Sequence, residues 1–218
     1  LEHVEDSVFE NGKEVREAFR FLASLRNMLT GNETSGMGLT VKWDGAPAIF
    51  CGTNPENGKF FVGTKSVFNK NPKINYTVED IRQNHSGGLA EKLEIALKYL
   101  KKLNIKTVLQ GDMMFTSADI TKKKIDGSSY LTFTPNTITY AVPEKSLLGR
   151  KIQKSKIGIV FHTEYKGDTF ETMKASFAPT LKLANPTDVW YDDATFQDHS
   201  GTVTMVLSNV FDRVIYLR

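Results

Sequence analysis

The chain has 218 residues, of which 40% are hydrophobic and 24% are charged, and its formal net charge is +3. This is an ordinary globular composition, so it excludes a disordered chain, a collagen-like chain and a disulfide scaffold. The single cysteine, Cys51, has no partner for a disulfide within the chain and predicts a reducing, cytoplasmic location. No apolar run approaches the roughly 18 residues of a membrane span, and no apolar signal-peptide segment is present, so we expect no membrane association.

The first predicted elements are one helix followed by short strands. Apolar residues recur at steps of three and four over 5–29, which predicts an amphipathic helix. Three β-rich runs follow at 39–43, 48–51 and 59–63, with turn residues between them. This pattern is typical of hairpins with antiparallel neighbours. The polar, proline-containing stretch 69–75 is predicted to be a loop.

The middle of the chain adds two helices and a strand. Thr77, with an acid three residues later, indicates a helix start, and 89–103 has one apolar face and predicts a strong helix. A strand is predicted over 107–115. The lysines at 122–124 are expected in a loop.

The second half of the chain is predicted to be mainly strands. Further strands are indicated at 130–133, 137–142 and 156–165, a short helix at 143–154 with proline in its first turn, and weaker strands at 203–207 and 214–217. Strands outnumber helices and do not alternate with them, so we predict an α+β fold in one domain over 1–218.

The most informative segment is 41–47, in which Lys42 ends an apolar strand and Asp44-Gly45 follows. A free lysine amine is protonated at neutral pH and is then a poor nucleophile, but partial burial or a second cation would lower its pKa and activate it. Gly45 would let a backbone or a ligand approach closely. The alternative interpretation is a hairpin turn with a surface lysine, because four-residue patterns often arise by chance.

With its downstream elements this segment resembles the covalent nucleotidyltransferase superfamily of ATP-dependent DNA ligases, RNA ligases and mRNA-capping guanylyltransferases. In that superfamily the lysine of Lys-x-Asp-Gly attacks the α-phosphate of a nucleotide, which implies a lysyl-NMP intermediate on Lys42. Lys65 matches the position of a later basic residue that is commonly arginine. A lysine there would hold a phosphate as a point charge. Gly111-Asp112 resembles a Gly-Glu step whose carboxylate contacts ribose or a metal ion.

The resemblance also implies an aromatic residue that stacks on the nucleotide base. Tyr140 and Phe161 are both candidates for it. His162 and Glu164 are expected on the face of their strand opposite Phe161, either as a polar site or as a solvated surface. Glu164 is the candidate metal ligand beside Asp112.

Two later motifs of the superfamily, Glu-Gly and Lys-x-Lys, have no clear counterpart. Glu164 lacks a following glycine, and Lys174 and Lys182 are single lysines, of which Lys174 is kept as a candidate nucleotide contact. These departures predict either a chain that is incomplete at its C-terminus or a degenerate domain that binds without catalysing.

A closer resemblance extends over about residues 3–167. His-Val-Glu-Asp-x-Val-Phe, Lys-Trp-Asp-Gly-Ala-Pro-Ala-Ile-Phe, Phe-Asn-Lys-Asn-Pro-Lys, Gln-Gly-Asp and Ser-Lys-Ile-Gly-Ile-Val-Phe-His together resemble an uncharacterised family from large tailed bacteriophages. This implies a phage protein acting in the bacterial cytoplasm.

The leading hypothesis is therefore an ATP-dependent RNA or DNA ligase-like enzyme that uses ATP and Mg²⁺. Lys42 would take AMP and pass it to a 5′-phosphate end, from which a 3′-hydroxyl would displace it. The alternatives are a nucleotidyltransferase with an acceptor other than nucleic acid, and a non-catalytic phage module for binding or structure. The charge of +3 permits nucleic-acid binding without requiring it, and the lysines at 101, 102, 106 and 122–124 form either a binding patch or a solvated surface. Nothing in the sequence indicates the oligomeric state.

Overall fold

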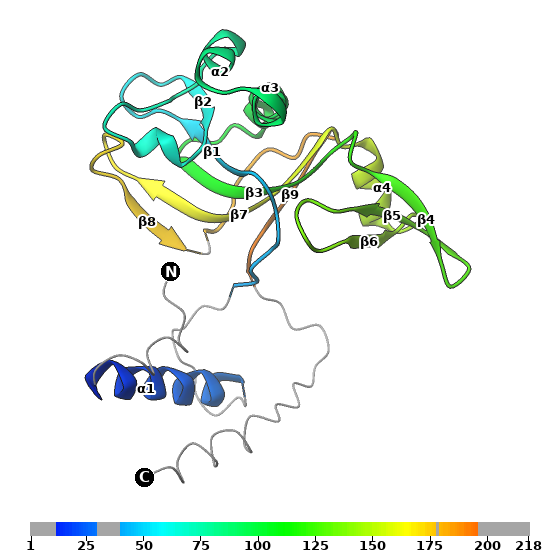
Figure 1. Cartoon of the computed structure of the whole chain (residues 1–218), viewed down its shortest axis with the longest axis horizontal. Coiled ribbons are helices and arrows are strands. Elements are labelled where there is room, and N and C mark those ends of the chain that lie inside the picture. The colour runs from blue at the N-terminus through cyan, green and yellow to red at the C-terminus, as the bar shows by residue number, and fades with distance from the viewer. Residues whose placement is uncertain (1–11, 30–39, 178, 196–218) are drawn as a thin grey trace. The chain divides into compact units, whose positions relative to one another are not determined.

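A computed structural model describes residues 12–29, 40–177 and 179–195. The chain divides into two units, and the second comprises Thr40–Thr195. In the first, the described element is α1 (Gly12–Leu29), which confirms the amphipathic helix from residue 12 onward (Figure 1). The predicted residues 5–11 of that helix, and the weak strands at 203–207 and 214–217, lie outside the described residues.

A six-stranded sheet forms the centre of Thr40–Thr195 (Figure 1). Its path is β2-β1-β3-β7-β8, and β9 pairs with β7 in parallel while all other pairs are antiparallel. The predicted hairpin of the first two strands is confirmed. The strands are β1 (Ala48–Thr53), β2 (Phe60–Gly63), β3 (Val108–Thr116), β7 (Ile157–Lys166), β8 (Lys174–Phe177) and β9 (Val189–Asp193).

Helices cover one face of this sheet. The 3-10 turn η2 (Lys65–Phe68) follows β2, and then come α2 (Val78–Asn84), α3 (Gly87–Leu100) and the turn η3 (Lys101–Leu103). The apolar side of α3 packs on buried strand residues, Phe161 among them, and all of these side chains are removed from water. The predicted start of α2 is confirmed, because Thr77 and Asp80 form a reciprocal capping box.

A smaller antiparallel sheet, in the order β4-β5-β6, lies to one side with α4 (Leu147–Lys154) (Figure 1). Its strands are β4 (Thr121–Ile125), β5 (Ser128–Phe133) and β6 (Tyr140–Pro143). The two sheets, their helices and the mostly antiparallel pairing confirm the α+β class.

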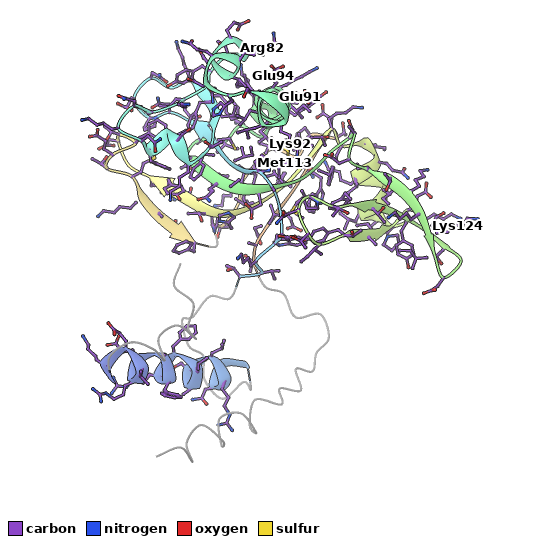
Figure 2. The ribbon with its side chains drawn as sticks, in the orientation of Figure 1. Arg82, Glu91, Lys92, Glu94, Met113 and Lys124 are labelled. Atoms are coloured by element: carbon purple, nitrogen blue, oxygen red, sulfur yellow. The ribbon has the colours of Figure 1, made fainter. Side chains whose placement is uncertain are left out.

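The prediction of a loop at 122–124 is wrong, because these lysines form β4. Asp126 and Gly127 both have positive φ and make a two-residue turn that suits the twist of a hairpin. Pairing needs only the backbone, so the lysine side chains stay in water on an edge strand, and Figure 2 shows Lys124 near the far end of this hairpin.

Other elements also differ from the predictions. Of the strand expected at 39–43, the described part contributes only an isolated bridge from Thr40 to Thr195. Helix α4 begins at Leu147, because Pro143 still pairs with β5 and the Ser146 side chain caps the helix by accepting from the Gly149 amide. Strands β8 and β9 were not predicted.

Candidate functional site

The segment of residues 40–47, here the Lys42 loop, connects both sheets. The Val41 amide donates to the Ala194 carbonyl at 2.7 Å, just past β9, and the Ala46 amide donates to the Met113 carbonyl of β3 at 2.9 Å. Lys92 of α3 donates to the Ala46 carbonyl at 3.3 Å, and Figure 2 shows Lys92 beside Met113. The segment therefore crosses the large sheet as an irregular chain rather than as the predicted strand, with Lys42 exposed in its middle.

Gly45 allows the Lys42 loop to lie directly on β3. A Cβ atom at this position would stand 2.5 Å from the Asp112 Cβ and 3.0 Å from the Met113 carbonyl oxygen. Only glycine permits this approach, so the predicted close contact at Gly45 is confirmed for a backbone. The Lys-Trp-Asp-Gly segment and the Gly-Asp strand, distant in sequence, are therefore in contact.

Asp44 joins the Lys42 loop to the small sheet. Its carboxylate accepts hydrogen bonds from Asn136 Nδ2 at 2.8 Å, from the Thr137 amide at 2.7 Å and from the Ile138 amide at 2.8 Å. These donors, the Ile138 amide foremost, hold the pKa of Asp44 below its ordinary value, and the charge of Lys42 acts in the same direction. Asp44 is thus a charged residue that links the Lys42 loop to the small sheet, and its contact with a nucleotide stays a prediction.

These hydrogen bonds predict an acid-dependent loss of stability. Because the folded-state pKa of Asp44 lies below its ordinary value of 3.8, its contribution to the free energy of unfolding is complete above that pH. It is lost as the pH falls through the folded-state pKa. We expect Asp44→Asn to be less stable than the native chain at neutral pH and to approach it in acid, as measured by denaturant unfolding over a pH series. A stability difference that is the same at every pH would contradict this assignment.

The two aromatic candidates occupy different environments. The Tyr140 hydroxyl accepts the Asp44 amide at 2.9 Å, and its ring stacks with Trp43 and with Phe133, each at 5.5 Å between centroids. Tyr140 therefore fastens the Lys42 loop to β5 and β6. Phe161 is 0% exposed beneath α3, which leaves no face of its ring for a base and corrects its candidacy.

Asp112 lies beside His162 on the partly open face of the large sheet. Its Oδ1 is 3.8 Å from His162 Nε2, and the two side chains are 22% and 29% exposed. The β3–β7 register shifts between Gln110 and Gly111, so that His162 is the extra residue of a β-bulge. Alternation predicts His162 on the face opposite Phe161, but it reveals neither the bulge nor the neighbouring Asp112.

The same bulge corrects the prediction for Glu164. Beyond it Glu164 pairs with Leu109, whereas Asp112 pairs with Val160, and Glu164 lines a hollow together with Leu109. Its carboxylate accepts from Thr107 Oγ1 at 2.9 Å and pairs with Lys166 at 2.8 Å. Glu164 therefore does not share a face with Asp112 and is not its partner for a metal ion.

The two remaining lysine candidates lie at different distances from the Lys42 loop. Lys65 is exposed and follows Gly63, which pairs with Phe50, so the register puts it at the end of β2 nearest the loop. Lys174 pairs with Lys166, six residues along β7 from the partner of Asp112, or about 20 Å away at ~3.3 Å per residue. The fold brings the Lys42 loop into contact with Asp112 at Gly45 and puts Lys65 just past the end of β2 that lies toward this loop, whereas Lys174 pairs at the far end of β7 from Asp112.

A metal ion bound beside Asp112 would have few protein ligands. Among residues 12–29, 40–177 and 179–195 no group of three or more His, Cys, Asp or Glu side chains has metal-binding geometry. Mg²⁺ in nucleotide sites is commonly held by one or two carboxylates together with phosphate oxygens and water, and the partly exposed Asp112 suits that role. Three hollows of the described surface, of about 530 to 590 Å³, lie elsewhere.

Comparison with known proteins gives one match. The chain matches the family of unknown function DUF6267 over residues 1–216. No curated protein and no solved structure matches it. In the described residues no helix has the length and apolarity to cross a membrane. Since the match spans nearly the whole sequence, the chain belongs to the family DUF6267.

Proposed function

We propose that this chain is an ATP-dependent, ligase-type nucleotidyltransferase that works through a lysyl-AMP intermediate on Lys42. The observation that carries the proposal is the contact between Gly45 and Asp112, at which a Cβ would come within 2.5 Å of the Asp112 side chain. It joins a Lys-x-Asp-Gly loop to a Gly-Asp strand, the two motifs on which the resemblance to this superfamily rests.

The chemistry requires a nucleophile and counter-charges for the phosphates. The Lys42 amine, once deprotonated, forms a bond to the α-phosphorus of ATP while the bond to pyrophosphate breaks. Lys65 and Mg²⁺ would offset the negative charge that the transferring phosphate and the leaving pyrophosphate carry. Asp112, whose Oδ1 lies 3.8 Å from His162 Nε2, would hold the ribose or the metal ion.

The acceptor is proposed to be a 5′-phosphate end of RNA or DNA. AMP would move from Lys42 Nζ to the terminal phosphate, and a 3′-hydroxyl would then displace AMP and seal the strand. A different acceptor leaves the first step unchanged, so the lysyl-AMP step is tested first.

A non-catalytic binding module is the second candidate. The observation that favours it is the strand register of Glu164 and Lys174, neither of which pairs beside Asp112. In the superfamily, later carboxylate and lysine motifs complete the site, and the described residues offer no replacement beside Asp112.

The decisive experiment is an intact-mass measurement. Purified chain is incubated with Mg²⁺ and each of ATP, GTP, CTP and UTP separately. A mass increase of one nucleoside monophosphate with ATP supports the proposed function, and an increase with another NTP corrects the nucleotide. An unchanged mass with all four favours the binding module.

A further inference from the structure

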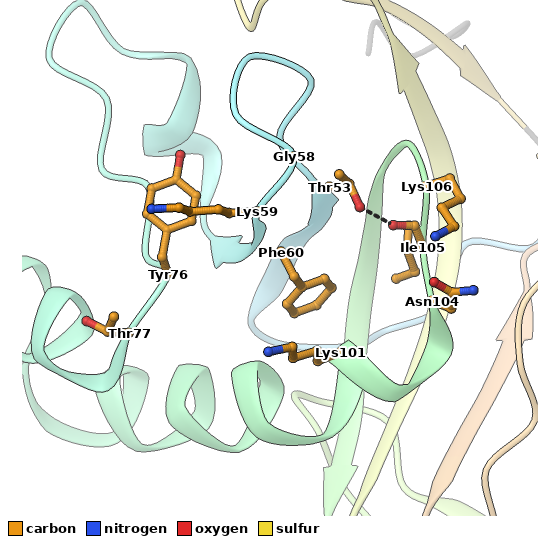
Figure 3. A pocket seen from close by; sticks show the side chains of 10 residues that line it. All are labelled: Thr53, Gly58, Lys59, Phe60, Tyr76, Thr77, Lys101, Asn104, Ile105 and Lys106. Carbon is orange, nitrogen blue, oxygen red and sulfur yellow. Dashed lines mark hydrogen bonds between the residues drawn. The ribbon is translucent and has the colours of Figure 1, made fainter.

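Two adjoining hollows lie where β1 ends and β3 begins, and the second extends to Phe177 of β8. The first has a volume of about 530 Å³ and is shown in Figure 3, and the second has about 590 Å³. Both are lined by Asn104, Ile105 and Lys106, so they adjoin at this segment, and together they are here called the lysine track. Asp112 lies five residues along β3 from Thr107, about 17 Å away at ~3.4 Å per residue.

The lysine track carries a strong excess of positive charge. Five lysines line it, and the one acidic side chain in its lining is Glu164, which already pairs with Lys166 at 2.8 Å. The carboxylate of Asp80 also interacts electrostatically with Lys59, although it does not line either hollow. The five lysines are Lys59, Lys101, Lys106, Lys166 and Lys182.

Several of these amines are available to a ligand. The side-chain amines of Lys101, Lys106 and Lys182 make no hydrogen bond or ion pair within the described part of the chain. In Figure 3 the lysines of the first hollow come from three segments, with Lys59 and Lys101 on two sides of the Phe60 ring and Lys106 across the start of β3. Like charges held together without counter-ions repel one another, so the arrangement favours a ligand that brings several negative charges.

Aromatic side chains accompany the lysines. Phe177 of β8 lines the second hollow and is 70% exposed, and in the first hollow Lys59 lies 6.0 Å from the centre of the Tyr76 ring. The Tyr76 hydroxyl accepts from Asn54 Nδ2 at 2.6 Å and from Asn57 Nδ2 at 3.0 Å, which leaves its own proton free to donate. Lysines for phosphates beside aromatic rings for bases are typical of surfaces that bind single-stranded nucleic acid.

We propose that the lysine track binds single-stranded nucleic acid, with phosphates on Lys101 and Lys106 and an unpaired base on Phe177. A lone nucleotide would occupy one hollow, whereas the positive charge extends over both. A duplex keeps its bases stacked on each other and offers none to Phe177. The proposal stands on residues other than those of the Lys42 site and goes beyond the lysyl-AMP reaction.

The test is the fluorescence anisotropy of labelled oligo-dT and oligo-U of about 12 nucleotides, titrated with the full chain at several salt concentrations. Each lost phosphate contact lowers the slope of log K against log salt by about 0.7, so Lys101→Ala with Lys106→Ala lowers it by about 1.4 and weakens binding about 10-fold. Phe177→Ala weakens binding about 5- to 150-fold, and Phe177→Tyr restores it. Lys154→Ala, which removes an exposed lysine on α4, leaves both quantities unchanged.

Three outcomes would overturn the proposal. They are no binding of either oligonucleotide at low salt, a double lysine variant with the native slope, and a duplex that binds as tightly as the single strand while Phe177→Ala has no effect. If the chain transfers AMP but does not bind the strand, the binding role of the lysine track is refuted and the proposed function stands. If the chain binds the strand but does not transfer AMP, the proposed function is refuted and the binding role stands.

Discussion

Lys42→Ala is expected to abolish covalent nucleotide labelling, so that the intact mass stays unchanged with every NTP. The amine is the atom that forms the bond to phosphorus, and no other described lysine lies on the Lys42 loop. Lys42→Arg is expected to be equally inactive, because arginine keeps the positive charge but its guanidinium is not deprotonated in proteins. Mass spectrometry of the wild type and both variants, followed by peptide mapping of the labelled site, measures this effect.

Matched variants separate chemistry from folding. Lys65→Ala is expected to slow labelling by about 100- to 1,000-fold, as the loss of one charge-stabilising group does in other sites, and Lys65→Arg to retain it. Lys154→Ala should label at the native rate. Labelling of Lys42→Ala to the native extent, or a modified peptide that lacks residue 42, would refute the assignment of the nucleophile.

Gly52→Ala is expected to be among the most destabilising single methyl additions in the β1–β3 pair. Gly52 has φ +148, which side-chain-bearing residues rarely adopt, and a Cβ there would stand 2.0 Å from the Thr107 carbonyl oxygen. That oxygen accepts a hydrogen bond from the Thr53 amide at 3.1 Å, so moving it away from the added Cβ would break this hydrogen bond. Backbone strain and overpacking together cost about 3 kcal/mol or more, which corresponds to a fall in Tm of about 6–12 °C.

Two other glycines provide controls for this prediction. Gly58 also has a positive φ, +70, but nothing lies within 4 Å of its added Cβ, so Gly58→Ala measures strain alone and costs about 1–2 kcal/mol. Gly88, in α3, has neither strain nor close neighbours, and Gly88→Ala is expected to be neutral or to stabilise by up to about 1 kcal/mol. Equal losses in Gly52→Ala and Gly58→Ala would contradict the role of the Thr107 contact.

Local patterns explain which elements could be predicted from the sequence. The helix over 89–103 and the strands at 48–51 and 107–115 follow from apolar periodicity, and the start of α2 follows from the Thr77 capping box. Each of these signals depends on residues within a few positions of one another. Strand β4 was not predicted, because its run of lysines suggests a loop. The Asp126-Gly127 pair is typical of a hairpin turn and would have indicated this strand.

Some features of the candidate site could likewise be predicted from the sequence and others could not. The residue types at Lys42, Asp44, Gly45 and Asp112 are visible in the sequence, and their order suggests nucleotidyl transfer. The bulge at His162 is not visible, because one extra residue exchanges the two faces of a strand without changing its composition. That exchange takes Glu164 off the face of the sheet that carries Asp112.

The sequence by itself determined the α+β class, most of the element positions and the residues around which a nucleophile is proposed. Only the tertiary structure decided which of those residues meet. The contact of Gly45 with Asp112, the clamp of Asp44 on the Ile138 amide and the burial of Phe161 depend on chain segments that are far apart in sequence. Such contacts arise from strand register and packing, and these are set by the whole fold rather than by any local pattern.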